Sequence, residues 1–188
     1  MVSDNLESYI KVYKDIIPKK ICNTSIKELK KESWNMHEFY DTKTDSMYHL
    51  DKELSVSYAE NISTRECLMK LIFKSLENYI LKDLNYPWFK GWAGYTPIRF
   101  NKYEKNTQMN LHWDSIHSAF DGTVKGIPML SIVGVLNDDY KGGELIMRDK
   151  QIKLNGGDIL LFPSSFMYPH YVKEVTKGTR YSFVSWAY

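Results

Sequence analysis

A histidine and an aspartate two residues apart are the first candidates for chemistry in this chain of 188 residues. His112 and Asp114 lie in the β-rich run from Met109 to Asp114. Alternate residues of a strand share a face, so the two are predicted to project together, with Leu111 and Trp113 packed on the opposite side. One imidazole and one carboxylate are two of the three ligands of a facial iron site. The alternative is a solvated polar pair, because a single His-x-Asp also arises by chance.

A third ligand has to come from elsewhere in the fold, and His170 is the candidate. It follows Tyr168-Pro169, shortly after the apolar run Ile159 to Phe162. Taken alone, a histidine after a proline turn is more often a structural or exposed residue than a ligand. Its candidacy depends on Arg180, which lies ten residues further along and is one of four arginines in the sequence.

Arg180 belongs to an alternating run, Thr179 to Tyr188, in which it shares one face with Ser182, Val184 and Trp186. An arginine on the inward face of an apolar strand is costly unless it meets an anion. Its planar guanidinium suits a carboxylate held at two oxygens, and Ser182 can add a hydroxyl donor. Two interpretations stay open, a ligand carboxylate or a buried ion pair with an Asp or Glu of this chain.

The elements that position these residues are short β-rich runs separated by turns. The runs are Pro97 to Tyr103, Met109 to Asp114, Pro128 to Leu136, Glu144 to Arg148, Ile159 to Phe162 and Thr179 to Tyr188. The turns are Phe120-Asp121-Gly122, Asn137 to Gly143, Asn155-Gly156-Gly157-Asp158 and Lys177-Gly178. Many short strands with helices gathered at one end favour a jelly roll backed by helices.

Two helices are predicted in the first half. One follows Pro18 and runs to about Lys31, and the other begins at Ser63, where Ser63 and Glu66 have capping-box spacing. The second helix is expected to end before Asn85-Tyr86-Pro87.

Two neighbouring segments are less regular. Ile10 to Ile17 alternates weakly, as an edge strand does, and Tyr40 to Tyr58 is predicted to be a hairpin or a mobile loop.

Composition bounds the class of protein. With 43% hydrophobic and 26% charged residues, the chain has the composition of a single soluble globular domain. No apolar run approaches the roughly 18 residues of a membrane span, and the first residues do not resemble a secretory signal. A net charge of +2 gives no indication of nucleic-acid binding, and two cysteines do not indicate a disulfide-stapled domain. We therefore expect one reduced, cytoplasmic domain.

The order and spacing of these motifs resemble the iron(II)- and 2-oxoglutarate-dependent oxygenases, in particular the prolyl 4-hydroxylase-type branch. The resemblance covers about residues 95–188 and is carried by His112-Trp113-Asp114, Gly142-Gly143-Glu144-Leu145, His170 and Arg180-Tyr181-Ser182. It implies an α+β fold in a single domain, 1–188. A double-stranded β-helix (jelly roll) core of about residues 91–188 would be supported by helices within about residues 1–90.

The resemblance also assigns a metal and cosubstrate site. Its Fe(II) ligands would be His112, Asp114 and His170. Arg180 would hold the far carboxylate of 2-oxoglutarate, assisted by Ser182 or Tyr103. Some relatives place a further cosubstrate-binding tyrosine where this chain has Gly134 or Val135, so the contacts beyond Arg180 stay open.

Trp186 and Tyr95 are the residues expected to contact the substrate, and residues 40–58 are expected to form a lid or, alternatively, a plain surface connection. The remaining histidines, His37, His49 and His117, are assigned to surface or structural roles, with His117 of interest because it follows Asp114 by three residues.

The implied reaction is hydroxylation of a C–H bond, foremost in a prolyl residue of a peptide or protein. It would consume O2 and 2-oxoglutarate, release succinate and CO2, and use ascorbate as a reductant. The alternatives are a hydroxylase of free amino acids and a non-catalytic metal-binding jelly roll. The nucleic-acid dealkylating branch ranks lower, because its second arginine, six residues after the first, is Trp186 here. Neither a membrane nor a nucleic-acid partner is expected, and the oligomeric state stays open.

Overall fold

The computed structural model describes residues 3–41, 43–115 and 127–188. This part of the chain has two α-helices, α1 (Lys19–Leu29) and α2 (Arg65–Asn78). A 3-10 turn, η1 (Leu6–Tyr9), precedes α1, and a π-helical segment, η2 (Tyr79–Leu84), continues α2. His117 and the turn predicted at 120–122 lie outside the described residues.

The remaining elements are strands. They are β1 (Lys11–Tyr13), β2 (Asn35–Met36), β3 (Phe39–Asp41), β4 (Ser46–Tyr48), β5 (Ser55–Ser57), β6 (Arg99–Tyr103), β7 (Met109–His112), β8 (Leu130–Val135), β9 (Lys141–Gly142), β10 (Leu145–Met147), β11 (Lys150–Ile152), β12 (Ile159–Pro163), β13 (His170–Val172), β14 (Val175–Lys177) and β15 (Arg180–Ala187).

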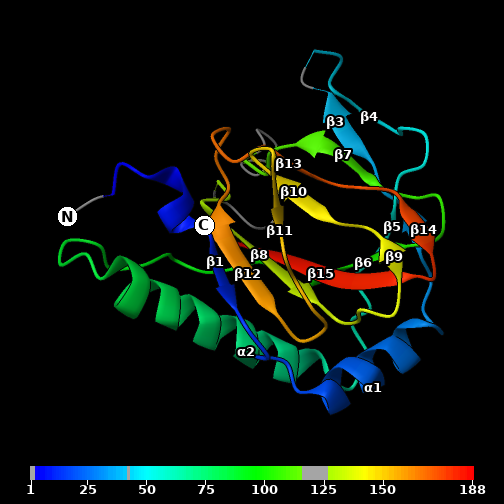
Figure 1. The fold of residues 1–188 in the computed structure, drawn as a ribbon, viewed down its shortest axis with the longest axis horizontal. Helices are drawn as coiled ribbons and strands as arrows, with labels where there is room; N and C mark the ends of the chain where they lie inside the picture. Colours follow the sequence, from blue (N-terminus) through cyan, green and yellow to red (C-terminus); the bar gives the residue numbers. More distant parts are fainter. Residues whose placement is uncertain (1–2, 42, 116–126) are drawn as a thin grey trace.

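The strands form two main sheets with antiparallel neighbours. The larger has the order β1-β12-β8-β15-β6-β5-β2, and the smaller has the order β11-β10-β13-β7. Figure 1 shows α1 and α2 along one side of the larger sheet, while the smaller sheet lies on the other side. Two small ribbons, β9-β14 and β3-β4, complete the arrangement. The described chain is therefore mostly β-sheet with a helical layer.

The larger sheet is buried on both faces, and β12 shows how its sequence achieves this. Ile159 and Leu161 pack into the core cluster that contains the helices, whereas Leu160 and Phe162 pack into the cluster between the two sheets. Successive side chains of a strand point to opposite faces, so a strand covered on both sides needs an unbroken apolar run. The run Ile159 to Phe162 meets that requirement.

All six β-rich runs predicted in the second half contain strands, with ends that differ by a few residues. In this second half, four short strands were not predicted: β9, β11, β13 and β14. Each has only two or three residues, too few for an alternating pattern to be visible in the sequence. His170, expected only after a proline turn, is the first residue of β13.

Both predicted helices are present, and the second ends at Leu84 before Asn85, which caps it in the left-handed conformation. The predicted capping box is wrong. Thr64 is the N-cap and makes no side-chain cap hydrogen bond. Ser63 donates instead from its backbone N and its Oγ to Glu28 of α1, each at 2.7 Å. Glu66 pairs with Lys70 one turn along, so the carboxylate beside Ser63 comes from the other helix.

The prediction that Leu111 and Trp113 pack behind the metal-binding face is also wrong. Leu111 is 67% exposed and Trp113 is 51% exposed. Leu111 lies in β7 and Trp113 is the first residue after it, and both side chains project to solvent from the edge strand of the smaller sheet.

The segments that connect and flank the helices are partly strand. Ile10 to Ile17 contains β1, an edge strand of the larger sheet, as predicted. Tyr40 to Tyr58 contains most of the β3-β4 hairpin and also β5, which extends the larger sheet beside β6. Within the described residues no helix is long and apolar enough to cross a membrane.

Candidate metal centre

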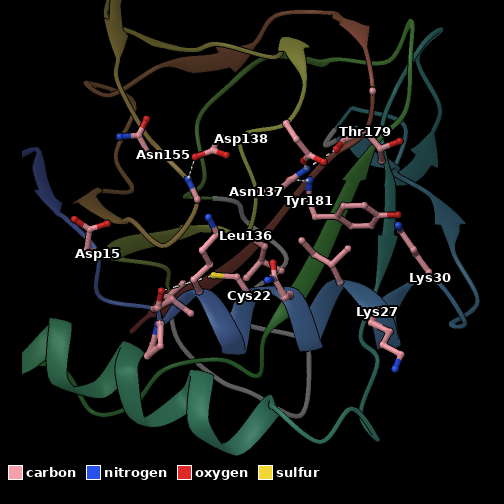
Figure 2. Close-up of a pocket in the computed structure, with 18 residues that line it drawn as sticks. Asp15, Cys22, Lys27, Lys30, Leu136, Asn137, Asp138, Asn155, Thr179 and Tyr181 are labelled. Atoms are coloured by element: carbon pink, nitrogen blue, oxygen red, sulfur yellow. Dashed lines mark hydrogen bonds between the residues drawn. The ribbon is translucent and has the colours of Figure 1, made fainter.

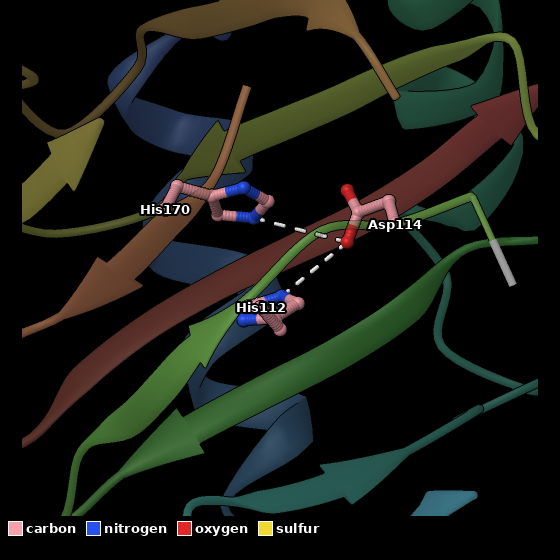
Figure 3. Close-up of side chains that lie close together, drawn as sticks. All are labelled: His112, Asp114 and His170. Atoms are coloured by element: carbon pink, nitrogen blue, oxygen red, sulfur yellow. Dashed lines mark ion pairs between the residues drawn. The ribbon is translucent and has the colours of Figure 1, made fainter. Parts of the chain in front are cut away.

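Three side chains predicted as metal ligands lie together between the two sheets. His112 is the last residue of β7, and His170, the first residue of β13, is its register partner across the strand pair. Asp114 follows two residues after β7 ends, and its Oδ1 lies 3.3 Å from His112 Nε2 and 3.8 Å from His170 Nε2 (Figure 3). One ligand atom from each residue lies within 4.8 Å of the others. A single ion can therefore reach all three.

Asp114 is positioned differently from the prediction that it shares a strand face with His112. The strand has already ended, and the following backbone is held by Ser115 N, which donates to Ser164 O at 3.0 Å. Ser131 Oγ of β8 then donates to Asp114 Oδ2 at 2.6 Å, which leaves Oδ1 directed at the two imidazoles. No sequence signal pointed to Ser131, because its role depends on the pairing of distant strands.

Backbone carbonyls orient both imidazoles. His112 Nδ1 lies 2.7 Å from the carbonyl oxygen of Asn110, and His170 Nδ1 lies 3.1 Å from that of Tyr168. A carbonyl can only accept, so each Nδ1 carries a proton, and Nε2 is the ring nitrogen that faces Asp114. In its neutral form each ring is therefore the tautomer that binds a metal through Nε2.

The electrostatics of the cluster favour the same protonation states. Burial by itself would raise the pKa of Asp114, but His170, His112 and the Ser131 hydroxyl together hold it well below its usual value. Burial lowers the pKa of His170, although Asp114 acts in the opposite direction. Asp114 is therefore ionised near pH 7, and burial favours the neutral form of His170; these are the forms that bind a divalent cation.

Arg180 lies at the other end of the same cavity. It is 2% exposed, and its Nη1 donates to Ser182 Oγ at 2.9 Å. Its guanidinium carbon lies 4.8 Å from the centre of the Tyr103 ring, on the strand opposite. Its Nε has no hydrogen-bond partner, and no ion pair of Arg180 is found among the described residues. This argues against the buried ion pair considered from the sequence.

The other predicted contact residues separate into two locations. Trp186 lines the cavity on the same face of β15 as Arg180, together with Ser182 and Val184. Tyr95 does not line it. This residue packs against the helical core cluster, and its hydroxyl donates to the carbonyl oxygen of Met69 in α2 at 3.4 Å.

Two of the remaining histidines are described. His49 is exposed and lies 3.2 Å from Glu38. His37 is 6% exposed, and its Nδ1 lies 3.5 Å from Oε2 of the buried Glu53. Burial lowers the pKa of His37, with Glu53 opposing this shift. Both observations agree with surface or structural roles, and they reveal a buried pair that the sequence did not indicate.

Sequence reasoning missed one charged residue of the cavity, Arg99. It lines the cavity with Asn101 and Tyr103, its neighbours at two-residue steps along β6. A usable signal was present, because a strand that turns Tyr103 toward the cosubstrate turns Arg99 the same way. The cavity itself is narrow, about 30 Å³, so a dicarboxylate can enter only if side chains such as Arg180 turn aside.

A much larger cleft lies elsewhere. Figure 2 shows it between α1 and the turns around Asn137, Asn155 and Thr179, with a volume of about 1220 Å³. Lysines of α1 and aspartates of the turns line it together, and neither the three-residue cluster nor Arg180 is among its lining residues. Cleft volume therefore does not indicate where the candidate metal site lies, whereas the cluster of possible ligand atoms does.

Residues 98–188 match the family model described as the 2OG-Fe(II) oxygenase superfamily. This part of the chain, slightly less than half of it, is similar to that superfamily. The matched region contains the three clustered ligands and Arg180, and the relatives found by sequence match about half of the chain. A PKHD-type hydroxylase of Xylella fastidiosa is 38% identical over 101 residues, which is 48% of this chain and 43% of that protein. One from Janthinobacterium is 36% identical over 129 residues, 59% of this chain and 53% of that protein. The chain thus spans about half the length of the curated relatives it matches.

Solved structures extend the likeness to nearly the whole fold of this chain. A Trichoplax adhaerens prolyl hydroxylase, solved with a peptide fragment of the hypoxia inducible factor oxygen degradation domain, superposes with a TM-score of 0.73 at 15% identity. The match covers 96% of this chain and 84% of that one. A Pseudomonas putida prolyl-4-hydroxylase has a TM-score of 0.61 at 16% identity and covers 95% of this chain and 91% of its own. At these identities the comparison establishes the fold.

Proposed function

We propose that this protein is an iron(II)- and 2-oxoglutarate-dependent dioxygenase that hydroxylates a C–H bond. The observation that carries the proposal is one cavity with the His112–Asp114–His170 cluster at one end and Arg180, without a counter-ion, at the other. Two histidines and one carboxylate on one side of an ion are the ligand set of non-haem Fe(II) oxygenases. The superfamily match over residues 98–188 supports the same assignment.

The donor set fits Fe(II). His112 and His170 present the lone pairs of Nε2, and Asp114 presents a free Oδ1 because Ser131 occupies Oδ2. A bound iron, with 2-oxoglutarate and O2, supplies the oxidation, and 2-oxoglutarate leaves as succinate and CO2. The carbonyls of Asn110 and Tyr168 keep the two rings in position throughout.

Arg180 is proposed to hold the far carboxylate of 2-oxoglutarate. A guanidinium donates two parallel hydrogen bonds to a carboxylate, and in this cavity both partners would be shielded from water. Ser182, already a hydrogen-bond partner of Arg180, can add a third donor once Arg180 turns to the ligand. Tyr103 borders the same end of the cavity.

The two sheets correspond, in this proposal, to the double-stranded β-helix of the superfamily, supported by the helices of the first half in one domain. The likeness to prolyl hydroxylase structures supports this assignment. A cytoplasmic location and a requirement for ascorbate belong to the proposal as expectations.

A prolyl residue of a peptide is the proposed substrate, with a free amino acid as the alternative. The similar Trichoplax adhaerens enzyme was solved with a peptide, and the similar Pseudomonas putida protein is a prolyl-4-hydroxylase. A non-catalytic zinc module is less well supported. Zinc could bind the three ligands, but its binding would not explain why Arg180 is buried without an ion-pair partner in the described structure.

The β3-β4 hairpin is the proposed lid, within residues 40–58 and the adjoining Phe39. Phe39 lies at the base of the hairpin, opposite Tyr48 and 6.1 Å from the His112 ring, whereas residues 43–46 at the tip are exposed. The hairpin therefore borders the metal cluster at its base and is exposed to solvent at its tip.

The decisive experiment loads the protein with Fe(II) and measures succinate formed from 2-oxoglutarate without substrate. We expect slow uncoupled turnover by the parent. His170→Ala should lose both turnover and Mn(II) binding measured by electron paramagnetic resonance, because two ligands hold a divalent ion far less tightly than three. Lys70→Ala changes an exposed side chain on α2, away from the cavity and the proposed lid, and is the control.

Normal succinate formation by His170→Ala would refute the metal assignment. Mn(II) binding by the parent without any consumption of 2-oxoglutarate would favour the non-catalytic module. A mass increase of one oxygen on proline-containing peptides or on free amino acids, assayed side by side, would then identify the class of substrate.

A further inference from the structure

Arg99 is a second cation that lines the cavity, and its side chain is partly exposed. Its Nε is buried without a hydrogen-bond partner, and its guanidinium carbon lies 5.1 Å from the centre of the Trp186 ring. No ion pair of Arg99 occurs within the described residues. Burial lowers the pKa of Arg99, with Tyr58 and Asp114 opposing, but an arginine remains charged near pH 7. A partly buried cation without a counter-ion is costly, so its retention calls for an explanation.

The two acidic residues nearest to this region are already engaged. Asp114 accepts from Ser131 and faces the two imidazoles. Glu53 accepts at Oε1 from the backbone and side-chain amides of Asn110, at 3.1 and 2.5 Å, and its Oε2 faces His37. Neither forms an ion pair with Arg99, so the guanidinium has no acidic partner within the described residues.

The position of Arg99 separates it from the cosubstrate clamp. On the paired strands β6 and β15, Tyr103 lies opposite Arg180, whereas Arg99 lies opposite Val184. Four residues of strand put roughly 13 Å between these positions. Asp114 lies nearer to Arg99 than to Arg180 along the sheet. Its hydrogen-bond donor Ser131 pairs with Trp186, which is two residues from Val184, the register partner of Arg99. A cosubstrate that extends from Arg180 to the metal therefore leaves Arg99 beside the metal cluster, on the β6 side.

A second unpartnered donor accompanies Arg99. Trp186 Nε1 is buried without a hydrogen-bond partner and lines the same cavity. An indole N–H and a guanidinium can only donate, so a ligand that satisfies both must offer at least two acceptor lone pairs. A carboxylate has two such oxygens and also supplies the missing negative charge.

We propose that Arg99, with Trp186, binds a carboxylate of the primary substrate, so that this enzyme acts beside an acidic group. The inference rests on the proposed function and refines it, since the carboxylate belongs either to an acidic residue next to the hydroxylated one or to a free amino acid. Arg99 is a specificity-determining residue in this scheme, and Arg180 is not.

The test compares probes that differ only in charge, on protein loaded with Mn(II) and 2-oxoglutarate. One arm uses proline-containing hexapeptides with Asp or Asn beside the proline, and the other uses L-proline, L-glutamate and their carboxamides. In the parent, calorimetry should show at least one acid binding about tenfold or more tightly than its amide. Arg99→Gln should reduce that ratio to less than about twofold, and Arg99→Lys should restore part of it.

The affinity for 2-oxoglutarate, titrated separately, distinguishes the possible outcomes. Arg99→Gln should leave the affinity for 2-oxoglutarate within about twofold of the parent, whereas Arg180→Gln should weaken it strongly. Arg65→Gln on α2 should change neither the affinity for 2-oxoglutarate nor the affinity for the acidic probes. Equal binding of acids and amides by the parent, or an unchanged preference in Arg99→Gln, would overturn the proposal. Weakened 2-oxoglutarate binding in Arg99→Gln would make the residue part of the cosubstrate site. If the parent binds no 2-oxoglutarate, the proposed function fails, while the charge preference is still measured.

Discussion

The two faces of the larger sheet differ in whether the polar groups buried against them have hydrogen-bond partners. On the helix-covered face, buried hydroxyls are satisfied: Ser25 Oγ lies 2.7 Å from Thr64 Oγ1, and Ser75 donates to the Leu71 carbonyl. On the face toward the smaller sheet, Arg99, Asn101, Arg180 and Trp186 each have a buried side-chain atom without a partner, and all four line the metal cavity.

This difference separates stability from function. Buried polar groups in folded proteins nearly always have partners, so a concentration of unpartnered ones is expected where a ligand binds. Along β15, residues that pack into the hydrophobic core alternate with residues that face the cavity. Tyr181 and Phe183 pack into the helical core, while Arg180 and Ser182 face the cavity. One strand thus contributes to the hydrophobic core and to the site at the same time.

The largest effect on stability is expected on the helix-covered face. Leu161 is fully buried there, so Leu161→Ala should lower the free energy of unfolding by about 2–5 kcal/mol through lost burial and an unfilled cavity. Urea unfolding followed by circular dichroism measures this loss. A value below about 1 kcal/mol would mean that the helices contribute little to this core.

On the cavity face, the effect should appear in binding instead. Arg180→Ala is expected to weaken 2-oxoglutarate binding by about a hundredfold or more, since a buried charge-assisted contact is lost. Arg180→Lys should be intermediate, because the charge remains without the planar fork. Titration of Mn(II)-loaded protein measures both variants.

Arg180→Met sharpens the contrast between the two faces. Since Arg180 has no counter-ion in the described structure, an apolar side chain of similar length should leave the free energy of unfolding unchanged or raise it. A loss of more than about 2 kcal/mol would show that Arg180 is a structural residue.

A buried charge with all its partners offers the opposite case. Asp158, in the turn before β12, accepts hydrogen bonds from Lys14 Nζ, Asp15 N and Asn155 N at 2.8–3.0 Å. Burial by itself would raise its pKa, but these donors bring it below the usual value. Asp158→Asn should therefore cost about 1–3 kcal/mol of unfolding free energy at pH 7.

The sign of the pH dependence follows from the lowered pKa of Asp158. Its stabilising contribution is complete above the unfolded-state pKa of about 4 and is lost as the pH falls through the lower folded-state value. The difference between parent and Asp158→Asn in urea unfolding should thus narrow below about pH 4. A constant difference from pH 7 to pH 3 would contradict this assignment.

The smallest effect is expected at the β3-β4 hairpin, the proposed lid. Limited proteolysis should cut first within residues 40–58, because this hairpin is exposed at its tip. Mn(II), 2-oxoglutarate and a bound substrate together should slow that cleavage severalfold. Initial cleavage elsewhere, or no protection, would leave the segment a plain surface connection.

The sequence alone predicted those parts of the molecule that depend on local patterning. Runs such as Ile159 to Phe162 and Thr179 to Tyr188 are long enough to show strand periodicity, and the order of His112, Asp114, His170 and Arg180 is visible without a structure. Local alternation also placed Arg180 and Trp186 on one face of β15, where the cavity is found.

Other features were decided only by the tertiary structure, because each depends on residues far apart in the chain. The pairing of β7 with β13 brings His170 beside His112, and Ser131 on β8 positions Asp114. The same long-range packing leaves Leu111 exposed on an edge strand and leaves Arg99 without an acidic partner. Burial and charge pairing are properties of the assembled sheets, so no local pattern could predict them.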